Sequence, residues 1–133
     1  MDKKASILIV DDEKIVCDMA KRSFEAEGHD VTVFTDSTDA LAVLKEKFFD
    51  ILITDLKMKE VDGLQLLDFV QQNCLETKVI IFTAFGTPET ATDAFHKQAF
   101  DYFTKPVRIK DLIASVSRAL DTSNFNMGVK NNG

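Results

Sequence analysis

DILITD, residues 50–55, contains three consecutive apolar side chains, Ile51, Leu52 and Ile53, and then stops at a carboxylate, Asp55. The apolar run predicts a short β-strand, and its lack of alternation is typical of a strand that is covered on both faces, as in a parallel sheet. An acid after a strand most often starts a turn or caps the next helix. The role of Asp55 therefore depends on the rest of the chain.

Similar runs occur on both sides of this stretch. Residues 7–10, 31–34, 78–82 and 101–103 predict four more strands, and amphipathic segments at 14–27, 36–48, 63–70, 87–95 and 109–120 predict helices between and after them. The spacing suits β-α-β units. Five strands that alternate with five helices predict one α/β domain, in which a doubly wound parallel sheet is covered by helices on both faces.

Local signals place the helix ends and the buried faces. Asp36 or Ser37 is expected to cap the second helix, which would carry Phe48 on its apolar face. Thr87 followed by Pro88 predicts the start of the fourth helix. We expect three residues of that helix to point inward: Ala91, Ala94 and Phe95.

Composition favours a single globular domain of 133 residues with 45% hydrophobic side chains. The net charge of −6 argues against direct binding to nucleic acid. No apolar stretch is long enough for a signal peptide core or a membrane span, so we expect no membrane contact and a cytoplasmic protein. The two cysteines, Cys17 and Cys74, do not have the spacing of a metal site or a redox motif. Residues 1–121 form the predicted domain, and residues 122–133 a flexible tail or truncated linker.

Four of the five predicted strands are followed or ended by polar residues that could act on a ligand. Parallel strands bring their carboxyl ends to one edge of the sheet, where ligands bind. The groups expected there are Asp11, Asp12, Asp55, Thr83 and Lys105. Three carboxylates repel one another, and one lysine cannot neutralise them, so a divalent ion with oxygen ligands such as Mg²⁺ is predicted, with Mn²⁺ as a substitute.

This set of groups suits phosphoryl transfer. A metal and a lysine stabilise negative charge on phosphoryl oxygens, and an aspartate can act as the nucleophile and become an acyl phosphate. Helix caps and a surface lysine would explain each residue separately. Agreement at four strand ends favours a site.

Five segments in order resemble the receiver domain of two-component response regulators: ILIVDDE at 7–13, ILITD at 51–55, MKEVDGL at 58–64, IIFTAFG at 80–86 and DYFTKP at 101–106. The resemblance covers residues 6–120. It implies a flavodoxin-like (βα)5 fold with strand order 2-1-3-4-5. Residues 83–95 and 101–106 are similar to the receivers of enhancer-binding transcription activators.

The resemblance also implies roles in phosphorylation. Asp55 would accept a phosphoryl group from a sensor histidine kinase or a histidine phosphotransfer protein. Asp12 would bind Mg²⁺ directly, Asp11 mostly through water, and Asp55 and the backbone carbonyl of Lys57 would complete the protein ligands. The result would be a phosphorylation-activated signalling switch that assists its own phosphoryl transfer and dephosphorylation but is not a conventional turnover enzyme.

Further residues would contact the phosphoryl group or respond to it. Lys105 would contact it, Thr83 would bond to it and move, and Tyr102 would change rotamer with Thr83. The side chains of Lys57 and Phe85 would modulate hydrolysis. Pro106 follows Lys105 in a peptide bond that is usually cis in the family, and Lys59 stands where the family usually has proline, which leaves the loop after Asp55 less rigid.

Partners and alternatives follow from the same resemblance. A downstream effector or a lost output domain is expected, with a homodimer through the last two helices as a further possibility. Phe95, Phe100, Arg108 and Arg118 are candidates for that face. One alternative is a docking module that is independent of phosphate. A metal-dependent phosphatase is a weaker one, since it would want a second aspartate at the position of Lys57.

Overall fold

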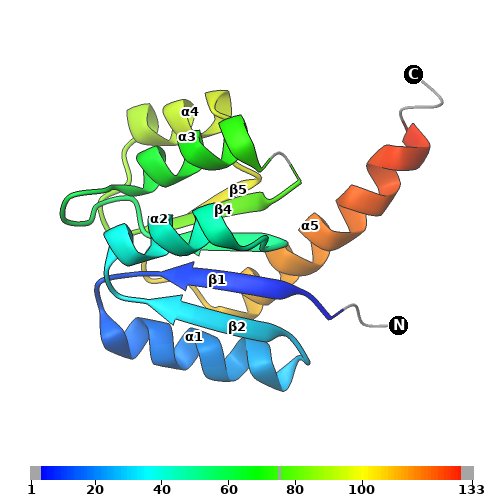
Figure 1. The fold of residues 1–133 in the computed structure, drawn as a ribbon, viewed down its shortest axis with the longest axis horizontal. Helices are drawn as coiled ribbons and strands as arrows, with labels where there is room; N and C mark the ends of the chain where they lie inside the picture. Colours follow the sequence, from blue (N-terminus) through cyan, green and yellow to red (C-terminus); the bar gives the residue numbers. More distant parts are fainter. Residues whose placement is uncertain (1–3, 75, 130–133) are drawn as a thin grey trace.

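A five-stranded parallel sheet forms the centre of the protein, which a computed structural model describes over residues 4–74 and 76–129, with side chains to residue 121 (Figure 1). The strands are β1 (Ser6–Val10), β2 (Asp30–Phe34), β3 (Ile51–Thr54), β4 (Lys78–Thr83) and β5 (Asp101–Thr104). Their order is β2-β1-β3-β4-β5, and every neighbouring pair is parallel. This confirms the strand order and the fold class.

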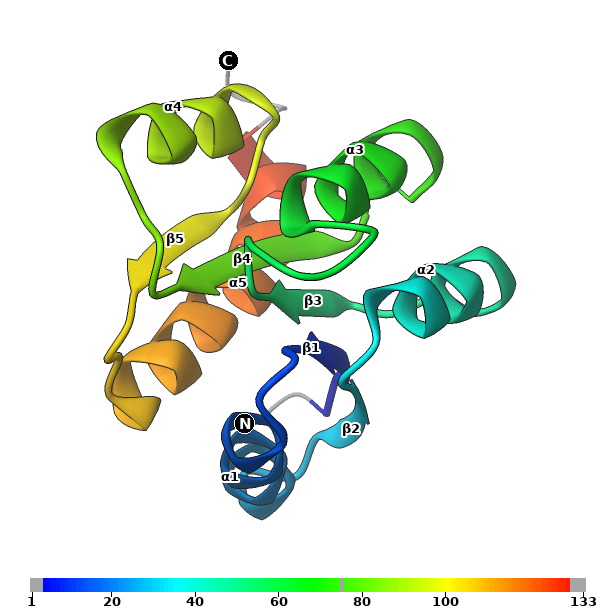
Figure 2. The same cartoon turned by 90° about the vertical axis from the view of Figure 1, so that its left-hand side faces the viewer.

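Helices cover both faces of the sheet. They are α1 (Lys14–Ala26), α2 (Ser37–Glu46), α3 (Gly63–Asn73), α4 (Pro88–His96) and α5 (Ile109–Val129). Figure 2 shows α1 and α5 on one side of the strands and α2, α3 and α4 on the other. The doubly wound arrangement follows from this division.

The core consists of two apolar clusters, one on each face of the sheet. Alternate residues of β1 point to opposite faces, so Ile7 and Ile9 join the cluster under α1 and α5, whereas Leu8 and Val10 join the cluster under α2, α3 and α4. All four are fully buried. The burial of each such side chain contributes about 1.5–3 kcal/mol. This two-sided burial explains why the strand sequences are continuously apolar.

Side-chain caps fix the starts of three helices. The Asp36 carboxylate accepts a hydrogen bond from the Thr38 N–H at 2.8 Å, so Asp36, rather than Ser37, caps α2. Thr87 caps α4 with Pro88 as its first residue, as predicted. Asp62 and Gln65 form a reciprocal capping box at α3. The loops before these helices lie at the carboxyl edge of the sheet.

Three sequence predictions about the helices were wrong. Phe48 lies beyond α2, which ends at Glu46 because Lys47 is already extended, and Phe48 is 50% exposed. Phe95 does not point inward: Ala94 takes the buried position of α4, and Phe95 is 49% exposed. The helix α5 continues to Val129, past its predicted end at residue 120, whereas the division of the chain at residue 121 stays a prediction. Residues 130–133 lie outside the described part of the chain.

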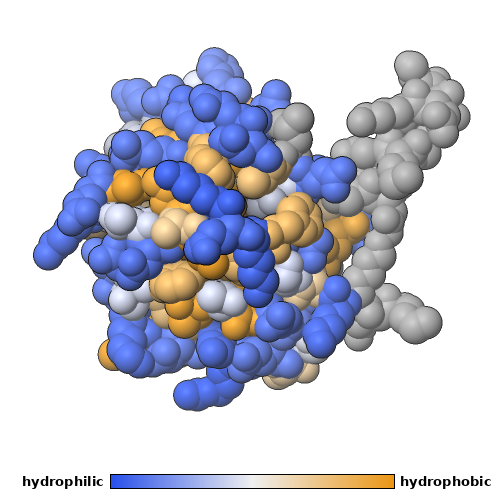
Figure 3. All heavy atoms as spheres, viewed as in Figure 1, coloured by the Kyte–Doolittle hydropathy of each residue, from blue (hydrophilic) through white to orange (hydrophobic). Residues whose placement is uncertain are grey.

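The surface drawn in Figure 3 carries both hydrophobic and hydrophilic side chains. On that face, hydrophobic atoms appear as separate patches among hydrophilic side chains. None of the helices within the described residues has the length and apolar character needed to span a membrane. Both cysteines are free thiols. Burial raises the pKa of Cys17 to about 11, and its thiol donates to the Asp11 carbonyl.

Candidate functional site

Two buried aspartates lie side by side at the carboxyl edge of the sheet. Asp11 follows β1 and Asp55 follows β3, and these strands pair so that Val10 stands opposite Thr54. The Asp55 N–H donates to the Val10 carbonyl at 2.9 Å, which fixes the two ends together. Asp11 is 0% exposed and Asp55 is 3% exposed. Two carboxylates in such a place are costly unless cations accompany them.

Lys105, just after β5, supplies the cation from the protein. Its Nζ atom lies 2.6 Å from Asp11 Oδ2, 3.2 Å from Asp55 Oδ2 and 3.1 Å from Glu13 Oε1. It also lies 4.8 Å from the centre of the Phe82 ring. The Lys105–Pro106 peptide bond is cis, as the resemblance implied. The sequence therefore located both the acids and their counter-ion correctly.

Burial and charge act in opposite directions on these groups. Burial raises the pKa of Asp11, although hydrogen bonds from Lys105 and from the Glu13 N–H oppose this shift. Burial alone would lower the pKa of Lys105, but its hydrogen bonds to Asp11 and Glu13, together with the charges of Asp11 and Asp55, outweigh burial and raise the pKa. Lys105 therefore stays protonated among carboxylates.

The two oxygens of Asp55 have different surroundings. Oδ1 accepts hydrogen bonds from the N–H groups of Leu56, at 2.6 Å, and Lys57, at 3.4 Å. Oδ2 faces Lys105. The backbone thus orients the carboxylate and leaves Oδ2 toward the cation. An oriented carboxylate beside an ammonium group is suited to bind or attack an electrophile that carries negative charge.

The three acids can also hold a metal ion. Asp11, Asp12 and Asp55 each offer a carboxylate oxygen, and these atoms lie within 4.8 Å of one another. Asp12 is exposed, whereas the other two are buried. Oxygen donors from carboxylates, with one side open to water, fit Mg²⁺. The donor set of this chain therefore fits the ion that the sequence predicted.

Thr83 and Tyr102 lie near the site but are not bonded to each other. Thr83 is fully buried at the end of β4, and its hydroxyl accepts a hydrogen bond from the Phe85 N–H at 3.1 Å. The Tyr102 hydroxyl lies 2.8 Å from Thr90 Oγ1 on α4. Among the described side chains no hydrogen bond joins the two. Their joint movement remains a prediction.

Lys57 and Phe85, the predicted modulators of hydrolysis, lie at the rim of the acidic site. The side chains of Lys57 and Phe85 are exposed, Phe85 at 59%. Of the candidates for a dimer or effector face, Phe95 is exposed, Phe100 packs on the core, Arg108 pairs with Asp111 and Arg118 pairs with Asp101.

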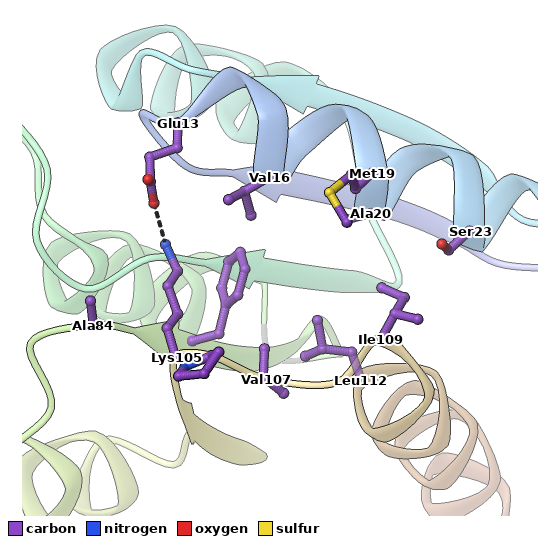
Figure 4. A pocket seen from close by; sticks show the side chains of 12 residues that line it. Glu13, Val16, Met19, Ala20, Ser23, Ala84, Lys105, Val107, Ile109 and Leu112 are labelled. Atoms are coloured by element: carbon purple, nitrogen blue, oxygen red, sulfur yellow. Dashed lines mark hydrogen bonds and ion pairs between the residues drawn. The ribbon is translucent and has the colours of Figure 1, made fainter.

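Glu13 is a contact of Lys105 to which the sequence assigned no role. It stands at the start of α1, and Figure 4 shows it and Lys105 pointing toward each other across the mouth of a pocket of about 600 Å³. The remaining pocket walls are mostly apolar, from α1, α5 and the segment before α5. A third acid directly after Asp11 and Asp12 was the available signal. The contact between Glu13 and Lys105, which lie 92 positions apart, could not be predicted from the sequence.

Gly63 lets the loop after Asp55 close against the strand end. A Cβ atom at this position would lie 2.3 Å from the Asp55 carbonyl oxygen and 3.0 Å from Leu56 Cα. Both neighbours are backbone atoms, so a side chain cannot be accommodated by a rotamer change. The Gly63 N–H donates to the Leu56 carbonyl at 2.8 Å.

We expect Gly63→Ala to destabilise the protein by about 1–3 kcal/mol through overpacking, and to displace the N–H groups that hold Asp55 Oδ1. Urea unfolding would measure the loss of stability. Gly28→Ala is the control, because no atom lies within 4 Å of its Cβ position and its cost comes only from its φ of +94°. Strain at Gly63 is contradicted if Gly63→Ala loses no more stability than Gly28→Ala and leaves the amide resonances of Leu56 and Lys57 unchanged.

The sequence matches one known family over nearly the whole domain. The family model for the response regulator receiver domain matches residues 7–117. The chain is a response regulator receiver domain. Receiver domains are the phosphorylation-activated switches of two-component systems, they bind Mg²⁺ at an acidic pocket, and they are not a conventional enzyme family.

Similar proteins include transcriptional regulators. The transcriptional regulatory protein ZraR of Salmonella typhimurium is 33% identical over 88% of this chain and 26% of its own length. The DNA-binding transcriptional regulator NtrC of Proteus hauseri is 31% identical over 89% of this chain and 25% of its own length. The solved beryllofluoride-activated NtrC4 receiver domain dimer has a TM-score of 0.83 at 27% identity, over 89% of this chain and 98% of that one. This receiver thus spans about a quarter of the length of the curated relatives that it matches.

Proposed function

We propose that Asp55 is the phosphoacceptor of this receiver. The observation that carries the proposal is the position of Asp55 Oδ2, 3.2 Å from Lys105 Nζ and within the cluster of carboxylates formed with Asp11 and Asp12. The donor is a phosphohistidine on a sensor histidine kinase or a phosphotransfer protein. Asp12, Asp55 and the Lys57 carbonyl would bind Mg²⁺ directly and Asp11 mostly through water. The bound ion would supply positive charge for the oxygens of the transferring phosphoryl group.

The transfer is a nucleophilic displacement. Asp55 Oδ2 attacks the phosphorus of the phosphohistidine, a P–O bond forms and the P–N bond breaks, and the imidazole leaves with the electron pair of that bond. Lys105 is drawn from Asp11 and Glu13 to the phosphoryl oxygens. The domain assists this transfer and the later hydrolysis of the acyl phosphate, in which Lys57 and Phe85 at the rim limit the access of water.

The phosphoryl group adds about −1.5 to −2 charges beside Asp55. Thr83 exchanges its bond with the Phe85 N–H for one to a phosphoryl oxygen, and Tyr102 leaves Thr90 for the space that Thr83 vacates. A change in population from 1:99 to 99:1 requires about 5.5 kcal/mol of differential interaction. A few charge-assisted hydrogen bonds supply energy of this order.

The signal then passes to an output domain or a separate effector, as the lengths of the curated relatives suggest. A homodimer through α4 and α5 is the proposed active form, supported by the dimeric state named for the NtrC4 receiver. The receiver itself does not bind nucleic acid, since its net charge is −6. Two free thiols suit the reducing cytoplasm.

Mass spectrometry after incubation with acetyl phosphate and Mg²⁺ tests this function. The expected result is a gain of one phosphoryl group that maps to Asp55 and is lost when EDTA replaces Mg²⁺. A folded protein that stays unlabelled and shows no saturable response to Mg²⁺ would instead favour the phosphate-independent docking module. Continuous release of phosphate from phosphomonoesters would favour a phosphatase.

A further inference from the structure

The loop between β3 and α3 is held by hydrogen bonds at its base and in its middle. At the base, the Gly63 N–H donates to the Leu56 carbonyl. In the middle, the hydroxyl of Ser37, on the first turn of α2, donates to the Lys59 carbonyl at 2.8 Å. Figure 1 shows this loop reaching the start of α2. The loop that follows the phosphoacceptor is therefore attached to a helix from another part of the chain.

The middle of the loop needs such an attachment. Glu60 has a φ of +66°, a backbone conformation that residues other than glycine rarely adopt. Strained backbone of this kind persists only where surrounding contacts determine it. Thr38 Oγ1 donates to Glu60 Oε2 at 3.0 Å, next to the bond from Ser37. Ser37 is 3% exposed, whereas Lys59 and Glu60 are exposed, so Ser37 is the buried member of this contact.

We propose that Ser37 is a positioning residue for the metal site. By holding the Lys59 carbonyl, its hydroxyl fixes the loop segment that presents the Lys57 carbonyl two residues earlier. The inference rests on the proposed function, in which that carbonyl is a Mg²⁺ ligand. Groups that orient ligands affect metal affinity although they do not touch the metal. The hydrogen bond from Ser37 thus restrains the loop at Lys59, which carries no restraint of its own on backbone rotation.

The test compares Ser37→Ala with Ser115→Ala in the full chain. Ser115 is an equally buried serine, 0% exposed, whose hydroxyl donates to Asp101 Oδ2 at 2.8 Å on the other face of the sheet. Mg²⁺ titrations followed by amide resonances give the dissociation constant of each variant. Hydrogen exchange without Mg²⁺ reports the order of the loop amides, and urea unfolding reports overall stability.

We expect Ser37→Ala to weaken Mg²⁺ binding by about threefold to tenfold, the effect of one hydrogen bond, and to speed exchange in residues 57–61. Ser115→Ala should change the dissociation constant by less than about twofold at a similar loss of stability. If both variants bind Mg²⁺ like the wild type, the positioning role is overturned while the proposed function stands. If the wild type shows no saturable response to Mg²⁺, the proposed metal site fails and the inference fails with it.

Discussion

Asp55→Asn is expected to remove phosphorylation of this receiver by acetyl phosphate, with labelling lower by at least about a hundredfold. An amide oxygen is a much weaker nucleophile than a carboxylate. The fold should survive, because the carbonyl oxygen of the substituted amide can still accept the Leu56 N–H that now bonds to Asp55 Oδ1 at 2.6 Å. Mass spectrometry of the intact protein and of its peptides measures the label.

Asp50→Asn is the matched control for this variant. Asp50 precedes the same strand, β3, but lies at its amino end, where its carboxylate accepts hydrogen bonds from the N–H and the hydroxyl of Ser6. An amide oxygen can accept both bonds, so this variant should fold and be labelled like the wild type. Equal labelling of the Asp55→Asn and wild-type proteins would contradict the assignment of the phosphoacceptor.

The sequence predicted those parts of the site that depend on strand ends. Once the apolar runs were recognised as parallel strands, their carboxyl ends were expected at one edge of the sheet. The strand order implied by the family resemblance then brought Asp11, Asp55 and Lys105 together. The structure confirms this at distances of 2.6 and 3.2 Å from the lysine to the two acids. Periodicity and topology were sufficient here because each group directly follows a strand.

Contacts between distant segments were not predictable in the same way. The Ser37–Lys59 bond joins residues 22 positions apart, and neither residue belongs to a pattern that a strand or helix imposes. The Tyr102–Thr90 contact likewise depends on how α4 lies against β5. The prediction that Phe95 is buried was wrong for a related reason. Hydrophobicity favours burial of Phe95, but the small Ala94 occupies the buried position of the helix. Such details are set by tertiary packing and not by local propensity.

Lys105→Met is expected to lower the stability of the Mg²⁺-free protein by about 3–5 kcal/mol, because it leaves buried carboxylates without their cation. Asp11 and Asp55 have side-chain exposures of only 0% and 5%. A loss of this size corresponds to about 10–20 °C in melting temperature for a domain of this length. Thermal unfolding in EDTA measures it.

Excess Mg²⁺ should recover more stability in Lys105→Met than in the wild type, because a cation bound by the folded protein replaces the one that was removed. The matched control is Lys97→Met. Lys97 Nζ also lies 2.8 Å from a carboxylate, Asp68 Oδ1, but the two side chains are 39% and 45% exposed, so we expect solvent screening to leave that pair little effect on stability. If the two variants lost equal stability in EDTA, Lys105 would not be the cation on which the buried acids depend. The comparison thus separates a lysine that neutralises the buried acids of the proposed phosphorylation site from a lysine that only pairs on the surface.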